Sequence, residues 1–306
     1  MRGNGKLYNY FYSIFLSENT KRKSEKIIIL IAILSFIIHL LIITLTDLDI
    51  LHFDDSSRLL TSPIAAIYTP FSFILIYEVY LLVYYLPKST SIYIGKQYEI
   101  ITLIIIRRVF KDLSRLEFSS DWFTIKNDLD FSYDIIATVI LFFLIFIFYR
   151  LNDLSKIDQK KNTLPSPEIS SFIRMKNGIA ILLIPVFLGL AIYSLSRWVD
   201  ESFFSTSLNV EAIKDINTIF FDDFFTILIL IDVLLLLFSF LHTDKFNIVV
   251  RNSGFIISTI LIKLSFGTEG LLNTILIVVA VLFGVAMLAI HNRYEKKLTP
   301  SANNEK

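Results

Sequence analysis

Long apolar segments separated by short polar ones dominate the chain, and this pattern predicts membrane-spanning helices. Most of the strongly apolar segments approach the ~20 residues with which an α-helix crosses ~30 Å of hydrocarbon. These segments are residues 27–45, 64–86, 135–149, 179–195, 219–241 and 271–290. A soluble chain of this length would show shorter apolar runs at helical or strand period. We therefore expect an all-α polytopic integral membrane protein.

Two weaker apolar segments, residues 92–110 and 246–266, decide how often the chain crosses the membrane. The first contains Lys96 and the second contains Arg251, besides other polar residues. Both segments are still long enough to span, and their basic side chains can extend to an interface. We expect eight transmembrane helices, and the alternative is six spanning helices plus two re-entrant segments.

Composition and charge agree with this class. Apolar residues make up 54% of the 306 residues, the mean hydropathy is +0.64, and the formal net charge is +1. With eight spans and a cytoplasmic N-terminus, most of the 29 Lys and Arg residues fall on the cytoplasmic side, as the positive-inside rule requires. The six-span alternative gives nearly the same balance. The bias toward Ile, Phe, Lys and Asn suggests an AT-rich bacterial genome, so we expect the protein in the cytoplasmic (inner) membrane of a bacterium. The charge balance places both termini on the cytoplasmic side.

Polar segments divide the chain into five parts. The first is a cytoplasmic N-terminal segment, whose apolar residues recur at helical spacing and suit a helix lying on the membrane surface. It is basic, and the apolar segment after it has no cleavage site, so we expect that segment to be retained as a span. The five parts are the N-terminal segment 1–25, a first membrane bundle 26–150, a cytoplasmic linker 151–176, a second membrane bundle 177–293 and a cytoplasmic tail 294–306.

The two bundles read as two copies of one four-segment unit. Residues 71–86 align with residues 225–240 without a gap, and the next segments align after one added residue. The aligned charged pairs are Glu78 with Asp232, Lys96 with Arg251, and Arg108 with Lys263. Because membrane helices share an apolar composition, chance similarity is the alternative to an internal duplication.

Charged side chains inside the apolar segments are the candidate functional residues. A charge at membrane depth costs several kcal/mol unless it is neutralised, paired or hydrated. Glu78 and Asp232 each lie within a strongly apolar segment, and the segment that follows each of them offers bases that could pair with it. The candidate substrate-binding or ion-binding residues are Glu78, Asp232, Glu99, Lys96, Arg107, Arg108, Arg251 and Lys263.

Two functions follow from these charges. A carboxylate that alternates between protonated, cation-bound and ion-paired states suits a secondary transporter or an ion-conducting protein. In transporters, glycine-interrupted segments at matching positions mark the binding site, and Gly95 and Gly254 meet that description. The alternative is a non-catalytic scaffold or subunit of a membrane complex, in which static ion pairs hold the helices. A voltage-sensor-like bundle is disfavoured, because a sensor needs a basic residue at every third position along one helix. The basic residues Arg107, Arg108, Lys111 and Arg115 do not keep that spacing and mostly lie beyond the apolar segment.

Soluble catalytic signatures are absent from the sequence. It has no cysteine, no Walker A loop, no HExxH and no GxSxG motif. We therefore expect no enzymatic activity, cofactor, metal site or nucleic-acid partner. The expected partners are the lipid bilayer, a small ion or solute, and a membrane-protein partner or a second copy of the chain.

Overall fold

The computed structural model describes residues 10–48, 50, 63, 65–113, 126–159, 167–203, 216–240, 246–268 and 270–298. Within them the chain forms eight long α-helices, a short helix over residues 10–15, one short 3-10 helix, η2 (Ala65–Ile67), and no strand. The long helices are α2 (Glu18–Asp47), α3 (Tyr68–Tyr85), α4 (Thr90–Leu113), α5 (Lys126–Gln159), α6 (Pro167–Phe203), α7 (Ile216–Phe240), α8 (Phe246–Ser265) and α9 (Gly270–Leu298). The predicted all-α class is confirmed.

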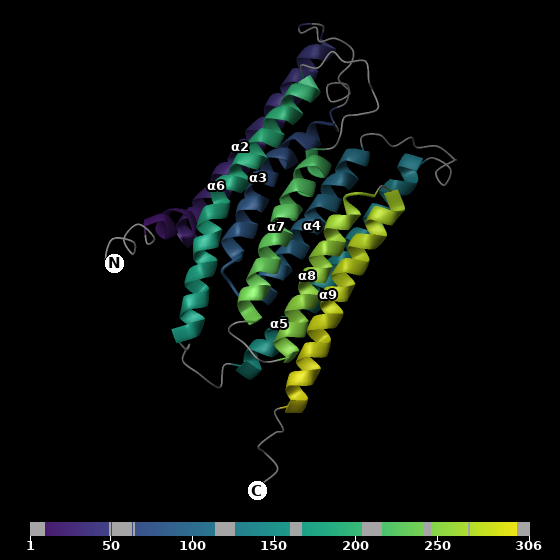
Figure 1. Cartoon of the computed structure of the whole chain (residues 1–306). Coiled ribbons are helices and arrows are strands. Elements are labelled where there is room, and N and C mark those ends of the chain that lie inside the picture. Colours follow the sequence, from purple (N-terminus) through teal and green to yellow (C-terminus); the bar gives the residue numbers. More distant parts are fainter. Residues whose placement is uncertain are drawn as a thin grey trace.

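Successive helices run in opposite directions, as the contacts between their ends demonstrate. At one end of the bundle Tyr84, late in α3, donates a hydrogen bond to Glu18 at the start of α2 (2.7 Å). At the same end Asn292, late in α9, donates to the carbonyl of Leu151, late in α5 (2.8 Å). At the opposite end, the C-terminal part of α4 meets the N-terminal part of α5, and the last turn of α8 meets the first turn of α9. Each helix therefore runs from one end of the bundle to the other (Figure 1).

Six of these helical stretches are long and apolar enough to span a membrane. They are Tyr10–Asp47, Asp128–Asp153, Phe172–Ser194, Asp223–Phe240, Phe246–Ser265 and Gly270–Glu295. The apolar part of α3 is shorter, and α4 does not qualify because of its charged residues. The polytopic membrane class predicted from the apolar segments is confirmed.

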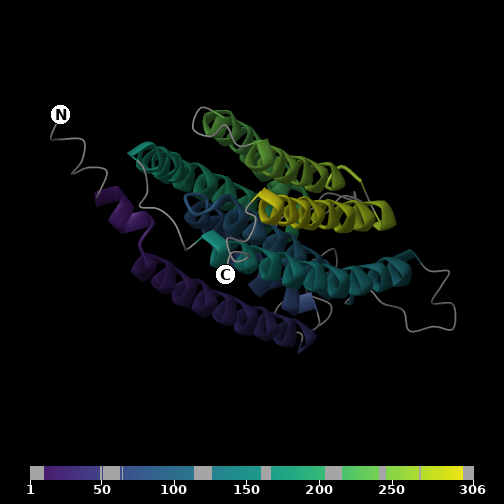
Figure 2. The same ribbon diagram turned by 90° about the horizontal axis from the view of Figure 1, so that it is seen from below.

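The polarity of α4 is tolerated because this helix is enclosed by protein. Figure 2 shows α3 and α4 in the middle of the bundle, with α2 along one outer side. Gln97, Tyr98 and Arg107 of α4 are each at most 1% exposed. Since α3, α5 and α8 surround these side chains, their polar groups face protein instead of hydrocarbon, which is the arrangement that charged residues need at membrane depth.

The two weaker apolar segments form continuous helices, α4 and α8, and neither folds back as a re-entrant segment. The expected interruption at the two glycines is wrong, because glycine costs a helix only about 1 kcal/mol. Both glycines instead allow close packing. A Cβ on Gly95 would lie 2.9 Å from the Tyr149 hydroxyl, and a Cβ on Gly254 would lie 2.6 Å from Cγ of Met287.

The helix ends differ from the predicted segment boundaries. Most of the predicted linker 151–176 is helical, because α5 continues to Gln159 and α6 begins at Pro167. Residues 160–166, in the middle of that linker, lie outside the described residues. The predicted tail 294–306 begins as helix, since α9 extends to Leu298.

The N-terminal segment is also helical in its described part. Residues 10–15 form a short helix that turns away from α2 (Figure 2), where a helix on the membrane surface was expected. Ser17 then caps α2, since its hydroxyl accepts a hydrogen bond from the Thr20 amide (3.2 Å). Leu7 and Tyr8, which belong to the same predicted helix, lie outside the described residues.

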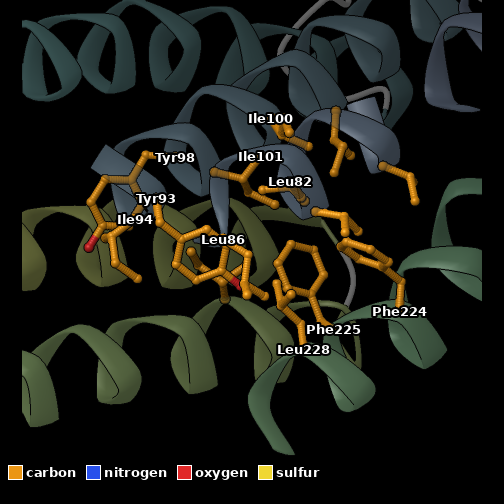
Figure 3. Packing of buried hydrophobic residues seen from close by; sticks show 14 of the residues in the cluster. Leu82, Leu86, Tyr93, Ile94, Tyr98, Ile100, Ile101, Phe224, Phe225 and Leu228 are labelled. Carbon is orange, nitrogen blue, oxygen red and sulfur yellow. The ribbon is translucent and has the colours of Figure 1, made fainter. Parts of the chain in front are cut away.

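One apolar core joins the helices of both predicted bundles. Leu82 of α3, Tyr93 and Ile101 of α4, and Phe225 and Leu228 of α7 pack together there (Figure 3). In lipid, such packing stabilises the bundle through van der Waals contact, because the surrounding hydrocarbon is as apolar as the core. The core fixes α4 against α7, and this contact positions the site described next.

Candidate functional site

Glu78 and Arg107 form a buried ion pair between α3 and α4. Nη2 of Arg107 donates to Oε2 of Glu78, and the side chains are 2% and 3% exposed, respectively. Arg107 is one of the bases that the sequence offered to Glu78. Because each charge compensates the other inside the bundle, this arrangement suits a fixed contact between two helices.

Arg108 joins three helices near the opposite end of the bundle from the α3–α4 turn. Its Nε and Nη2 donate to the two carboxylate oxygens of Asp134 in α5 (2.5 and 2.7 Å). Its Nη1 donates to Oδ1 of Asn273 in α9 (2.6 Å), and the hydroxyl of Thr274 donates to Asp134 (2.8 Å). Such two-pronged bonds between arginine and a carboxylate are strong and directional, so Arg108 holds α4, α5 and α9 together.

Lys96 and Glu99 pair with each other one turn apart on α4. Nζ of Lys96 lies 2.6 Å from Oε2 of Glu99, and the hydroxyl of Tyr149 donates to Oε1 of Glu99 (2.5 Å). Their side chains are 24% and 34% exposed, so this pair lies at the periphery of the bundle.

The two bases of α8 do not contact Asp232. Arg251 donates to Oδ1 of Asn252 (3.0 Å) and lies 3.2 Å from Nε2 of His291. Lys263 belongs to the last turn of α8. Neither of the bases expected to pair with Asp232 forms an ion pair with it.

Asp232 of α7 instead faces a cavity among α4, α6, α7 and α8. Its Oδ2 accepts a hydrogen bond from Nε2 of Gln97 in α4 (3.2 Å). The hydroxyl of Thr259 in α8 donates to Oε1 of Gln97 (2.9 Å) and so fixes the amide. The atom-free space of this cavity, counted together with the open solvent at its mouth, is about 430 Å³.

Lys176 of α6 brings a positive charge into the same cavity. This residue is 6% exposed, and its Nζ donates to the carbonyl of Lys88 in the α3–α4 turn (3.0 Å). The ammonium also lies 5.4 Å from the centre of the Phe172 ring. No nitrogen of Lys176 lies within 4.0 Å of a carboxylate oxygen of Asp232. A buried acid and a buried base thus face one cavity without forming an ion pair.

Tyr93 of α4 also lines this cavity, with a hydroxyl that has no hydrogen-bond partner among the described residues. The residue is 3% exposed, and its hydroxyl lies beside Asp232 and Gln97 without a hydrogen bond of good geometry to either. Figure 3 shows its ring leaving α4 within the central cluster. A buried hydroxyl without a partner costs about 1–3 kcal/mol, so this atom is available to a bound molecule.

Sequence reasoning identified Asp232 but missed the residues that surround it. Tyr93 and Gln97 are four positions apart on α4, and therefore on one face of that helix. Lys176 was assigned to the end of the linker. A search for polar residues at helical spacing inside the weaker apolar segments would have found Tyr93 and Gln97. Nothing local in the sequence connects Lys176 with Asp232.

The two acids superposed by the internal alignment have different surroundings. Glu78 pairs with a base of the helix that follows it, whereas Asp232 accepts from α4 and faces Lys176 of the helix that precedes it. The internal duplication stays a prediction.

Comparison with known proteins adds no relative: no family model, no curated protein and no solved structure matches the chain significantly. Among the described residues, no group of three or more His, Cys, Asp or Glu side chains could hold a metal ion. The cavity and the ion pairs are therefore the features of the molecule that indicate its function.

Proposed function

We propose that this multi-pass membrane protein is a secondary transporter or ion-conducting protein, and that the cavity at Asp232 is its binding site for a small ion or solute. The observation that carries the proposal is the unpaired arrangement of Asp232 and Lys176 in one cavity. Placing a single Asp or Lys in a membrane helix costs up to about 2.5–3.5 kcal/mol. A purely structural pair would recover this cost by direct contact, as Glu78 and Arg107 do.

The position of the cavity supports a moving site. Its walls come from α4 of the first predicted bundle and from α6, α7 and α8 of the second. A displacement of α4 against the other three helices would change access to Asp232, as alternating access requires. The hydrogen bond between Gln97 and Asp232 crosses this boundary, so it would break or reform during such a displacement.

The remaining candidate residues receive a supporting role in this proposal. The cavity is lined neither by Glu78 and Arg107 nor by Arg108. Their bonds connect α3 with α4, and α4 with α5 and α9. We expect them to hold α4 together with α3, α5 and α9 while α6, α7 and α8 move against α4.

Flux measurements on reconstituted protein test the proposal. Vesicles that contain the native chain, Asp232→Asn or Asp223→Asn are loaded with pH-sensitive and voltage-sensitive dyes and exposed to ion and solute gradients. Asp223 is the matched control, because it is an exposed aspartate near the start of the same helix. We expect flux with the native chain and the control, and background flux with Asp232→Asn. No flux under any gradient, together with a copurifying membrane protein, would instead support the scaffold alternative.

A further inference from the structure

We infer that the cavity at Asp232 binds a small zwitterion, a molecule with one ammonium and one carboxylate group on an apolar body, such as an aliphatic amino acid. This inference deepens the proposed function, since it names the substrate class of the same site. It concerns equilibrium binding, which can be measured whether or not transport follows.

The polar groups of the cavity complement both ends of such a molecule. The Asp232 carboxylate accepts one hydrogen bond, from Gln97, and its other lone pairs can accept from an ammonium group. The Lys176 ammonium uses one of its three donors on the Lys88 carbonyl, which leaves two for a carboxylate. The Tyr93 hydroxyl can donate to the same carboxylate or accept from the ammonium group.

Charge balance favours a zwitterion over a simple ion. A cation bound at Asp232 would leave the Lys176 charge uncompensated in a buried cavity, and an anion bound at Lys176 would leave Asp232 uncompensated. The ammonium nitrogen of Lys176 is more than 4.0 Å from either carboxylate oxygen of Asp232, so each residue can contact a separate charged group of one ligand. Only a molecule with both charges compensates both residues, and uncompensated buried charges are costly.

The apolar lining indicates the body of the ligand. Phe172 of α6, Leu235 of α7, and Phe255 and Ile256 of α8 line the cavity beside its polar groups. A hydroxyl-rich solute would lose its hydrogen bonds to water against these side chains. These four side chains therefore suit a short aliphatic body.

Three probes that share one branched 3-methylbutyl body test the inference on the purified full-length chain in lipid nanodiscs. L-leucine carries both charges, isoamylamine lacks the carboxylate, and 4-methylpentanoate lacks the ammonium group. Binding is measured by isothermal titration calorimetry. Because one charge-assisted hydrogen bond is worth at least about tenfold in affinity, we expect L-leucine to bind at least about tenfold more tightly than either relative. Equal binding of either relative, or no binding of L-leucine, would overturn the inference.

A pair of tyrosine variants adds a control for folding. Tyr93→Phe removes a hydroxyl that has no hydrogen-bond partner among the described residues. Tyr98 also belongs to α4 but lies outside the cavity, and Tyr98→Phe removes a hydroxyl that is hydrogen-bonded to Ser258 of α8 (2.8 Å). We expect Tyr93→Phe to weaken L-leucine binding about tenfold without lowering thermal stability. Tyr98→Phe should lower thermal stability and leave the affinity within about twofold. The reverse pattern would overturn the inference.

The same variants separate this inference from the proposed function. If ion flux depends on Asp232 while L-leucine does not bind, the zwitterion inference fails and the transport proposal survives. If L-leucine binds, Tyr93→Phe weakens this binding and Lys176→Met abolishes it, then the zwitterion inference holds even when no flux is found. In that second case the transport proposal fails.

Discussion

The Glu78–Arg107 pair should behave as a structural contact, and substitution of both partners tests this. Both side chains are at most 3% exposed. Glu78→Met or Arg107→Met alone leaves one charge buried without its partner, which costs about 3–5 kcal/mol of unfolding free energy. The double substitution leaves no charge and keeps the volume similar, so we expect a loss of at most about 1.5 kcal/mol.

These magnitudes are measurable by reversible unfolding of the purified chain in mixed micelles. A loss of 3 kcal/mol would change the ratio of folded to unfolded protein by about 150-fold. The free energy of unfolding is measured for the native chain, both single variants and the double variant, with helical circular dichroism as the signal. Double-mutant cycles in another membrane protein give an average of only about 0.6 kcal/mol for polar interactions between membrane helices. Single losses of that size, or a double variant whose loss equals the sum of the singles, would refute the reasoning.

Three further predictions concern packing and topology. Arg108→Lys should lower the unfolding free energy by about 1–2 kcal/mol in the same unfolding assay, because lysine cannot form the two parallel bonds to a carboxylate; an unchanged value would contradict this. Gly284→Ala should lower the unfolding free energy by about 1–3 kcal/mol, because the added methyl group would overlap the buried side chain of Tyr98. The control Gly178→Ala adds a methyl group that meets no atom within 4 Å and should not lower it, so equal losses would contradict this packing. Single cysteines at Ser89 and Gly267, in exposed turns at opposite ends of the bundle, should react with an impermeant maleimide from opposite sides of the membrane, and reaction from one side would contradict the antiparallel order.

The fold class was predictable because the length of an apolar segment directly reflects the thickness of a membrane. The path of α4 was harder to predict, since its charged residues argue against a span when the segment is considered alone. Its burial by α3, α5 and α8 is a tertiary feature. The sequence indicated that a base follows Glu78, but Arg107 and Arg108 are adjacent, and only the rotation of α4 directs the first to Glu78 and the second to Asp134.

The candidate site was predictable only in its central acid. Asp232 was evident because carboxylates are rare inside apolar segments. The residues that make its surroundings distinctive come from other helices, namely Tyr93 and Gln97 from α4 and Lys176 from α6. Such contacts depend on how the helices pack, and no local pattern in the chain records them.

The central claim, that the cavity at Asp232 is the site of transport, is tested most directly by comparing flux through three chains in matched vesicles. The native chain, Asp232→Asn, and the double variant Glu78→Met with Arg107→Met are reconstituted at equal amounts and driven by the same gradients. The account predicts that flux is retained by the double variant and lost with Asp232→Asn, since Asp232 lines the cavity whereas Glu78 and Arg107 do not. Flux that survives in Asp232→Asn, or that disappears only in a folded double variant, would contradict it.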